Sequence, residues 1–431
     1  MKAVVVALGK IGLPIAAQLT NTGHTVVGCD IDARVVETVN AGKAPFPNEA
    51  GLDEALARAV AVGRLRATTD TAAAVAEGPD LVIAVPPLIV DDHGTPEWSA
   101  VDAVVADIGR GLAAAQRRGI TVAIETTLPT GTTRNRIAPA LERASGLKAE
   151  TDFHLVFSPE RVYSGRILAD LATYPKLVGG LSAAGEAHGT ALYAQFLPEV
   201  EVWPMGGAEA AELTKLAETT YRDINIAFAN ELARHSDALG VDVQRVIDAA
   251  NSQPFSHIHR PGVAVGGHCI PVYPRFYLAG DPTAQLPAAA RTVNEAMPAY
   301  AVAVLQELLG GIEGARVLIL GVAYRGGVKE TAFSGAMPLR DNLRARGAIA
   351  VADDPLYDHD ELRSLGFEPW DGMPVHGVIV QADHAEYAQL RPADLAGARG
   401  VVDGRGVLDA AAFAAAGVPV RRLGDGAGRP N

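Results

Sequence analysis

The sequence predicts an α/β protein with two Rossmann-like, doubly wound domains bridged by a long central helix. Three observations lead to this fold class. Short β-branched runs alternate with Ala-rich helical patterns over roughly the first 180 residues, and a second alternation of the same kind begins at Arg316. Between them, from Ala208 to Gly240, apolar residues recur with helical spacing.

Composition limits the classes of protein that need to be considered. The chain has 431 residues, of which 48% are hydrophobic and 20% charged, which is typical of a soluble globular protein of two or three domains. A net charge of −13 argues against a general nucleic-acid binder. No apolar run approaches the roughly 18 residues of a membrane span, and the N-terminus does not resemble a signal peptide. With only Cys29 and Cys269, far apart, we expect a reducing, cytoplasmic compartment.

The first βαβ unit carries a dinucleotide-binding pattern. A strand "KAVVVAL" leads through the turn "GKIG" to a helix ending at Gly23, and a second strand ends on Asp30. Gly9 and Gly12 take the second and third places of a GxGxxG fingerprint, whereas Ala7 takes the first. An acid at Asp30 would accept hydrogen bonds from ribose hydroxyls and repel a 2′-phosphate, so NAD is favoured over NADP. The alternative is a Rossmann-like unit without a dinucleotide.

Further strands are predicted at 80–86, 120–126 and 153–159. The segments "AVPP", "ETTLPTGTT" and "FSPERV" lie at their carboxyl ends. In a doubly wound sheet these ends carry the ligand site.

The central helix is expected to join two domains and to offer a dimer face, because ~30 residues of helix span ~45 Å. Lys215 interrupts its N-terminal half, with Thr219 one turn later on the same side. A lone lysine on a helix is usually a solvated charge, so its role depends on its neighbours.

The second α/β unit opens with the strand "RVLILGVAY" and its own glycine turn at Gly321. We place linkers near Met205 and Gly310, and expect 424–431 to be a frayed tail. The predicted domains are 1–205 for NAD, 206–310 for the central helical and dimerisation part with Lys215 and Cys269, and 311–431 for a second ligand.

Several motifs together resemble the nucleotide-sugar 6-dehydrogenases, the family of the UDP-glucose, UDP-N-acetylmannosamine and GDP-mannose enzymes. "FSPERVYSG", "AELTKLAETTYRDINIAFANELA", "GGHCIP" and "VLILGVAYR…DDP" occur in the family's order, after the dinucleotide motif and "ETTLPTGTT". The resemblance covers nearly the whole chain. The spelling "GGHCIPV" looks more like the UDP-N-acetylhexosamine branch than the UDP-glucose branch.

The resemblance implies an NAD-dependent oxidation of a sugar C6 hydroxyl to a uronate in two hydride transfers. Cys269 would capture the aldehyde, because a thiolate is a strong nucleophile and Gly266 and Gly267 would let substrate approach closely. Lys215 would stabilise the alkoxide that develops at C6. Glu160 and Thr127 match family positions that hold the catalytic water and contact the reacting group.

The remaining site assignments follow from the same motifs. For the cofactor we assign Gly9, Lys10, Ile11, Gly12, Asp30, Arg34, Pro86 and Thr127. For the substrate we assign Glu160, Arg161, Lys215, Arg260, Gly266, Gly267 and Arg325, with Arg260 reaching a neighbouring subunit's site in a dimer or larger assembly. Lys176, Arg222 and Arg275 are further cations beside matched segments, and each of the arginines is as readily a surface ion pair.

The chain departs from the family pattern at three places. Tyr273 stands where an aspartate normally follows the cysteine, and Thr219 where an asparagine follows the lysine. In the C-terminal domain Ala332 replaces an arginine, while Lys329 adds a positive charge nearby. A general base is worth ~10²–10⁴-fold, so these changes could slow thioester hydrolysis without blocking the first oxidation.

Four alternatives therefore remain beside the four-electron reaction: a two-electron enzyme that stops at the 6-aldehyde, epimerase-like transient use of NAD, a non-catalytic binder of nucleotide sugar, and a β-hydroxyacid dehydrogenase. "GGHC" and the second α/β unit argue against the last. His257, His259, His268 and Cys269 match no standard zinc spacing, and we expect no metal.

Overall fold

The computed structural model describes residues 1–47, 49–91, 94–163 and 165–428. These residues fall into two units. The first contains Met1–Glu218 and Ala279–Asp281, and the second contains Thr219–Leu278 and the chain from Pro282 onward. The boundary lies inside α9 (Ala208–Leu239), a continuous helix of 32 residues, so the predicted long helix is confirmed. The three-part division of the chain stays a prediction.

The first unit is built on a doubly wound sheet. Its strands, in sheet order, number eight within the described residues: β10 (Val202–Pro204), β9 (Lys176–Gly180), β8 (Phe153–Phe157), β7 (Ile120–Ile124), β4 (Leu81–Ala84), β1 (Lys2–Val6), β2 (Thr25–Cys29) and β3 (Leu65–Thr68). All neighbours are parallel except β8 and β9. The order reverses between β1 and β4, which is where such sheets bind ligands.

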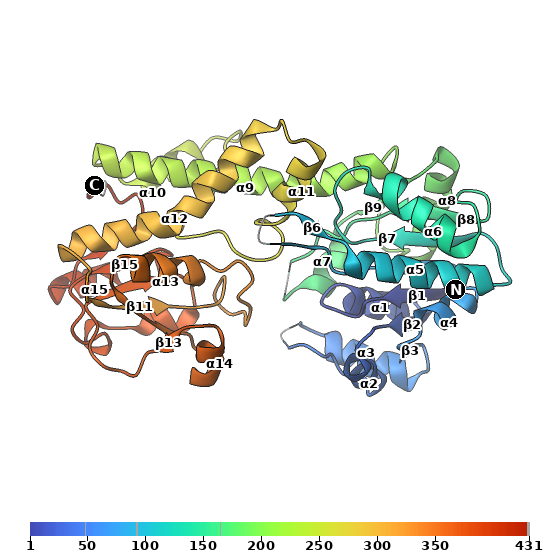
Figure 1. The fold of residues 1–431 in the computed structure, drawn as a ribbon, viewed down its shortest axis with the longest axis horizontal. Coiled ribbons are helices and arrows are strands. Elements are labelled where there is room, and N and C mark those ends of the chain that lie inside the picture. Colours follow the sequence, from blue (N-terminus) through green and yellow to red (C-terminus); the bar gives the residue numbers. More distant parts are fainter. Residues whose placement is uncertain (48, 92–93, 164, 429–431) are drawn as a thin grey trace. The chain divides into compact units, whose positions relative to one another are not determined.

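Two helical layers cover this sheet. Helix α1 (Gly12–Asn21) packs beside α3 (Leu52–Ala61), whereas α5 (Ser99–Ala114) packs between α4 (Thr71–Ala76) and α6 (Ala138–Ser145) (Figure 1). Every residue of β4 and β7 is buried. Burial on both faces explains why these strands read as continuous apolar runs.

The remaining elements of this unit complete its edge and loops. They are α2 (Ala33–Asn40), the hairpin of β5 (Ile89–Val90) and β6 (Pro96–Glu97), α7 (Ile167–Thr173) and α8 (Ala183–Phe196).

The second unit contains another parallel sheet. Six strands make it up in the part of the chain that the structure covers: β13 (Glu368–Pro369), β12 (Ile349–Asp353), β11 (Arg316–Leu320), β14 (Gly377–Val380), β15 (Val401–Asp403) and β16 (Val420–Arg421). Alternate residues of β11 serve two cores: Val317 and Ile319 enter one, and Leu318 and Leu320 the other. The predicted fold class, with two Rossmann-like sheets and a long helix between them in sequence, is confirmed.

Besides its share of α9, the described part of the second unit contains one long α-helix and five short ones. They are α10 (Val243–Ala250), α11 (Tyr273–Gly280), α12 (Gln285–Leu309), α13 (Ala336–Ala345), α14 (His359–Ser364) and α15 (Ala410–Ala415).

The C-terminal segment is packed, which corrects the expectation of a frayed tail as far as residue 428. Asp237 of α9 accepts hydrogen bonds from the backbone N–H groups of Gly424 and Gly426, each at 3.1 Å. Val243 donates its N–H to the carbonyl of Gly424 at 2.7 Å. A buried carboxylate therefore ties the chain end to α9, and residues 429–431 of the expectation lie outside the described residues.

Candidate active site

The dinucleotide turn follows β1. Gly12 begins α1 so close to the turn that a Cβ would collide with the carbonyl oxygen of Ala7, whereas a Cβ on Gly9 would meet nothing within 4 Å. Lys10 and Ile11 lie between them, so the backbone of 9–12 leads directly into the N-terminus of α1. Such a helix start suits a pyrophosphate. The turn thus fits a dinucleotide even without its first glycine.

Ala7 adopts the left-handed backbone conformation that the missing first glycine of the fingerprint would take. Its φ is +73°, a left-handed value, and its N–H donates to the Cys29 carbonyl at 2.8 Å. A side chain costs roughly 1–2 kcal/mol in this conformation.

We expect Ala7→Gly to stabilise the protein by about 0.5–1 kcal/mol, the left-handed penalty less the extra entropy of an unfolded glycine. Urea unfolding measures this. The matched control is Ala3→Gly in the same strand, which should destabilise because Ala3 is buried and is not at positive φ. A loss of stability in both variants would contradict the account.

Asp30 lies where a ribose acceptor is needed, at the end of β2. Its carboxylate accepts the N–H groups of Leu8 at 2.8 Å and Asp32 at 3.0 Å, which fixes it beside the turn. Arg34 pairs with Asp32 at 2.8 Å on the exposed start of α2. This ion pair holds the pKa of Asp32 below its usual value.

The ends of β4 and β7 are tied together. Thr126 donates its hydroxyl to the carbonyl of Pro86 at 2.5 Å, and Thr127 beside it is buried. The loop after them is held by Glu212 of α9, which accepts from the N–H of Gly131 at 2.5 Å and that of Thr133 at 2.8 Å. The sequence did not predict this role of Glu212, because the residues that it contacts lie some 80 positions away.

Lys215 is not a solvated charge. It is 7% exposed, and its Nζ donates to the carbonyl oxygen of Glu160 at 2.5 Å. The helix thus brings the predicted lysine to the loop after β8. Of the predicted residues in the first unit, the structure places Lys215 and Glu160 in direct contact.

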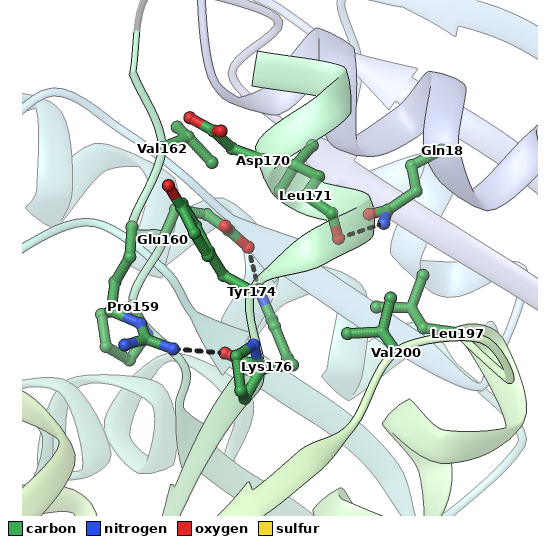
Figure 2. Close-up of a pocket in the computed structure, with 12 residues that line it drawn as sticks. Gln18, Pro159, Glu160, Val162, Asp170, Leu171, Tyr174, Lys176, Leu197 and Val200 are labelled. Atoms are coloured by element: carbon green, nitrogen blue, oxygen red, sulfur yellow. Dashed lines mark hydrogen bonds and ion pairs between the residues drawn. The ribbon is translucent and has the colours of Figure 1, made fainter. Parts of the chain in front are cut away.

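The Glu160 carboxylate belongs to a buried ion cluster, which we define as Glu125, Lys176, Glu160 and Tyr193. Lys176 at the start of β9 pairs with Glu160 (Figure 2). Its Nζ also lies 2.8 Å from Oε2 of Glu125. The hydroxyl of Tyr193 donates to Oε1 of Glu125. We predicted Lys176 as a further cation beside the matched segments. The structure instead pairs it with two carboxylates of the protein.

Arg161 is also engaged within its own unit. Its guanidinium donates to the carbonyl of Pro175 at 2.7 Å and lies 3.2 Å from the Glu218 carboxylate. Arg161, Glu160 and Lys176 line a small pocket beside α7, together with Gln18 and Tyr174 (Figure 2). The predicted substrate contact of Arg161 stays a prediction.

The cysteine loop lies in the second unit. Gly267 donates its N–H to the carbonyl of Ala332 at 2.8 Å and has φ +89°. A Cβ on Gly266 would come within 2.5 Å of the Tyr324 side chain, and one on Gly267 within 3.2 Å of its ring. The glycine pair is thus required by packing against Tyr324, and the close approach of substrate to it stays a prediction.

The Cys269 side chain is partly buried. Cys29 is fully buried, and this burial raises the pKa of its thiol to about 12. The Cys269 carbonyl accepts the N–H of Tyr273 at 2.9 Å, which starts α11. The Tyr273 ring lies 5.8 Å from that of Phe276. Tyr273 therefore has an aromatic neighbour within its own helix, while its role in catalysis stays a prediction.

The segment with the third departure packs on the same loop. His268 lies 2.5 Å from the Glu330 carboxylate, and Arg325 donates to the Tyr324 hydroxyl at 3.2 Å. Lys329 pairs instead with Glu361. The new positive charge is thus bound to a surface acid of α14.

A buried network surrounds Asp223 of the central helix. Asp223 accepts from Arg291 of α12 at 2.7 Å and from Asn294 at 2.7 Å. Asn230 donates to Asn294 at 2.8 Å and accepts the N–H of Gly262 at 3.0 Å, upstream of the cysteine loop. Thr219, one of the departures, is fully buried on the same helix. This network holds the start of the cysteine loop against α9 and α12.

Arg260 pairs with Asp248 and donates to Oε1 of Gln244 at 2.9 Å on the surface of its own unit. In the described residues no group of three or more His, Cys, Asp or Glu side chains is placed to hold a metal ion. Among those same residues, no helix has both the length and the apolar character to cross a membrane.

Two doubly wound sheets, a dinucleotide turn with an acidic acceptor, and a separate cysteine loop are the features of a dinucleotide-dependent oxidoreductase. Sequence models of one family match along the chain: the NAD-binding domain of the UDP-glucose/GDP-mannose dehydrogenase family at residues 1–197, its central domain at 209–297 and its UDP-binding domain at 318–410. The chain belongs to the UDP-glucose/GDP-mannose dehydrogenase family. It is an NAD-dependent dehydrogenase, which confirms the predicted class and cofactor.

Relatives of known activity are similar over their whole length. The chain is 32% identical to the UDP-N-acetyl-D-mannosamine dehydrogenase of Pyrococcus horikoshii, covering 95% of this chain and 96% of that protein. It is 31% identical to the NDP-N-acetyl-D-galactosaminuronic acid dehydrogenase of Ralstonia solanacearum, over 95% of this chain and 97% of the relative. The solved structure of the Pyrococcus enzyme superposes with a TM-score of 0.88 at 31% identity, over 99% of this chain and 100% of that one.

Proposed function

We propose that this protein oxidises the C6 hydroxyl of a UDP-N-acetylhexosamine to the uronate in two steps, through a thiohemiacetal and a thioester on Cys269. The observation that carries the proposal is the "GGHC" cysteine in a chain that matches all three domains of the family. The similar relatives that act on N-acetylated sugars support the choice of sugar. We place the reaction in the cytoplasm, where a catalytic thiol stays reduced.

The residues would divide the work as follows. Gly9, Gly12 and Asp30 would hold NAD, which would supply the hydride acceptor for both oxidations at C6. Lys215 stabilises the alkoxide of the first step, and the Cys269 thiolate adds to the aldehyde carbon. Glu160 holds the water whose oxygen attacks the thioester carbon; the C–S bond breaks, and the products are the uronate and the free thiol of Cys269.

Tyr273 and Thr219 favour one competing function, a two-electron enzyme that releases the 6-aldehyde. Both depart from the family pattern in the part of the site that manages water and protons. Tyrosine is a poor base near neutral pH because its reference pKa is near 10.

A substrate panel tests the proposed sugar. Initial rates of NADH formation should be highest with UDP-N-acetylmannosamine, UDP-N-acetylglucosamine or UDP-N-acetylgalactosamine, and lower with UDP-glucose and GDP-mannose. NADP in place of NAD serves as the cofactor control and should give little activity, because Asp30 repels its 2′-phosphate. A preference for UDP-glucose would contradict the assignment.

We further propose a homodimer formed through α9. Leu213, Tyr221 and Phe228 of this helix are 43%, 56% and 48% exposed, an unusual exposure for large apolar side chains that recur along one helix. Phe228→Asp should convert a dimer to a monomer in light scattering. A monomeric wild-type protein would contradict this proposal.

A further inference from the structure

The buried ion cluster of Glu125, Lys176, Glu160 and Tyr193 has one cation and two carboxylates. The side chains of Lys176, Glu125 and Glu160 are 7%, 0% and 10% exposed. Each acid stands at the carboxyl end of a strand, β7 for Glu125 and β8 for Glu160, and the lysine starts the antiparallel neighbour β9. The topology therefore brings the three charges together at the edge of the sheet where ligands bind.

Two buried negative charges cannot both be balanced by one ammonium. Burial raises the pKa of Glu125 to about 8; the Lys176 ammonium lowers this value, while the nearby charge of Glu160 raises it. Burial lowers the pKa of Lys176, but the Glu125 and Glu160 carboxylates outweigh this effect, so the pKa is raised on balance. Near neutral pH, Glu125 is thus the protonated member, and the ammonium is matched to Glu160.

The geometry also distinguishes the two acids. Glu125 is enclosed by Lys176 on β9, by Glu160 in the loop after β8 and by Tyr193 on α8, whose hydroxyl donates to it and whose ring lies 5.1 Å from Nζ of Lys176. Glu160 lines the pocket beside α7 (Figure 2). Its backbone carbonyl accepts a hydrogen bond from Lys215. Glu125 is therefore enclosed by protein. The Glu160 side chain borders a cavity, and its backbone carbonyl contacts Lys215, the lysine proposed for catalysis.

We propose that Lys176 and Glu125 are positioning residues for the reaction: Lys176 holds the Glu160 carboxylate in its water-binding position, and a protonated Glu125 leaves Glu160 as the negative charge that this ammonium balances. This inference rests on the proposed role of Glu160. It explains how the chain manages water despite Tyr273 and Thr219, since the remaining carboxylate is held by a dedicated buried cation.

The first arm of the test is turnover. Lys176→Met should lower kcat for uronate formation by ~10²-fold near neutral pH, because the Glu160 carboxylate loses the ammonium that holds it in place. KM for NAD should stay unchanged. Lys176→Arg, which keeps the charge, should recover most of the rate. Asp80→Asn, at the opposite end of β4, is the matched control and should leave kcat unchanged.

The second arm is thermal stability against pH, and it needs no turnover. An unfolded glutamate loses its proton near pH 4.3, whereas folded Glu125 keeps it to about pH 8, so rising pH favours the unfolded state in this interval. Wild type should therefore lose stability relative to Glu125→Gln from about pH 5 to about pH 8 and not beyond. The raised pKa of Lys176 acts only above about pH 10, outside the window.

The outcomes separate the two proposals. If wild type oxidises no nucleotide sugar, the proposed function is wrong, and the stability arm still decides whether Glu125 holds the proton. If wild type is active but Lys176→Met keeps its kcat, or Lys176→Arg is as impaired as Lys176→Met, the positioning role is overturned. Parallel stability curves for wild type and Glu125→Gln would overturn the protonation state on which it depends.

Discussion

Cys269→Ser should stop uronate formation, with a loss of at least ~10³-fold in the rate of the second oxidation. A serine hydroxyl is far less nucleophilic than a thiolate, so the aldehyde would not be captured as a covalent adduct. The first hydride transfer does not need the thiol. The variant should therefore release one NADH and a 6-aldehyde, identified by mass spectrometry of the nucleotide sugar.

Cys29→Ala is the matched control for this experiment. Cys29 is buried, with the pKa of its thiol raised to about 12, so it is inert at neutral pH. Its removal should leave the stoichiometry unchanged, and iodoacetamide should label Cys269 in preference to Cys29 in the wild-type protein. Uronate production by Cys269→Ser at a rate near wild type would show that the reaction does not pass through this thiol.

Lys215→Met should slow the first hydride transfer by ~10²–10³-fold. Its ammonium is buried and hydrogen-bonded to the Glu160 carbonyl at 2.5 Å, so it is already oriented and needs no reorganisation when negative charge develops on C6 oxygen. Methionine fills a similar volume without the charge. The measurement is single-turnover NADH formation with enzyme in excess over substrate.

Lys329→Met provides the comparison, because Lys329 is a partly exposed lysine paired with Glu361. It should keep a rate within a few-fold of wild type. Arginine at 215 should not substitute well, since its planar fork differs in shape and donor geometry from an ammonium. A Lys215→Met variant that transfers hydride as fast as wild type would remove the lysine from the mechanism.

The strands and the long helix were predictable because their signals are local. Continuous apolar runs follow from burial on both faces of β4 and β7, and α9 shows its apolar period over 32 residues. The dinucleotide turn was equally readable. Its departure at Ala7 keeps the backbone conformation of the missing glycine, with φ +73°.

The partners of buried charges were not predictable, because they come from distant parts of the chain. Lys176 read as a free cation, yet two acids from β7 and β8 enclose it. Gly266 and Gly267 read as room for substrate, whereas Tyr324, more than 50 positions later, packs against them. The glycines at 424–428 read as a loose tail until Asp237 supplied the acceptor for two of them. In each case side chains from elsewhere in the chain provide contacts that the local sequence does not show.

The number of NADH molecules formed per nucleotide sugar consumed tests the central claim most directly. Absorbance gives the NADH, and mass spectrometry of the same sample gives the sugar product. Two NADH per uronate is the result that a four-electron oxidation through Cys269 predicts, and it would show that Tyr273 does not prevent thioester hydrolysis. One NADH with a released aldehyde, or none with any donor sugar, would contradict it.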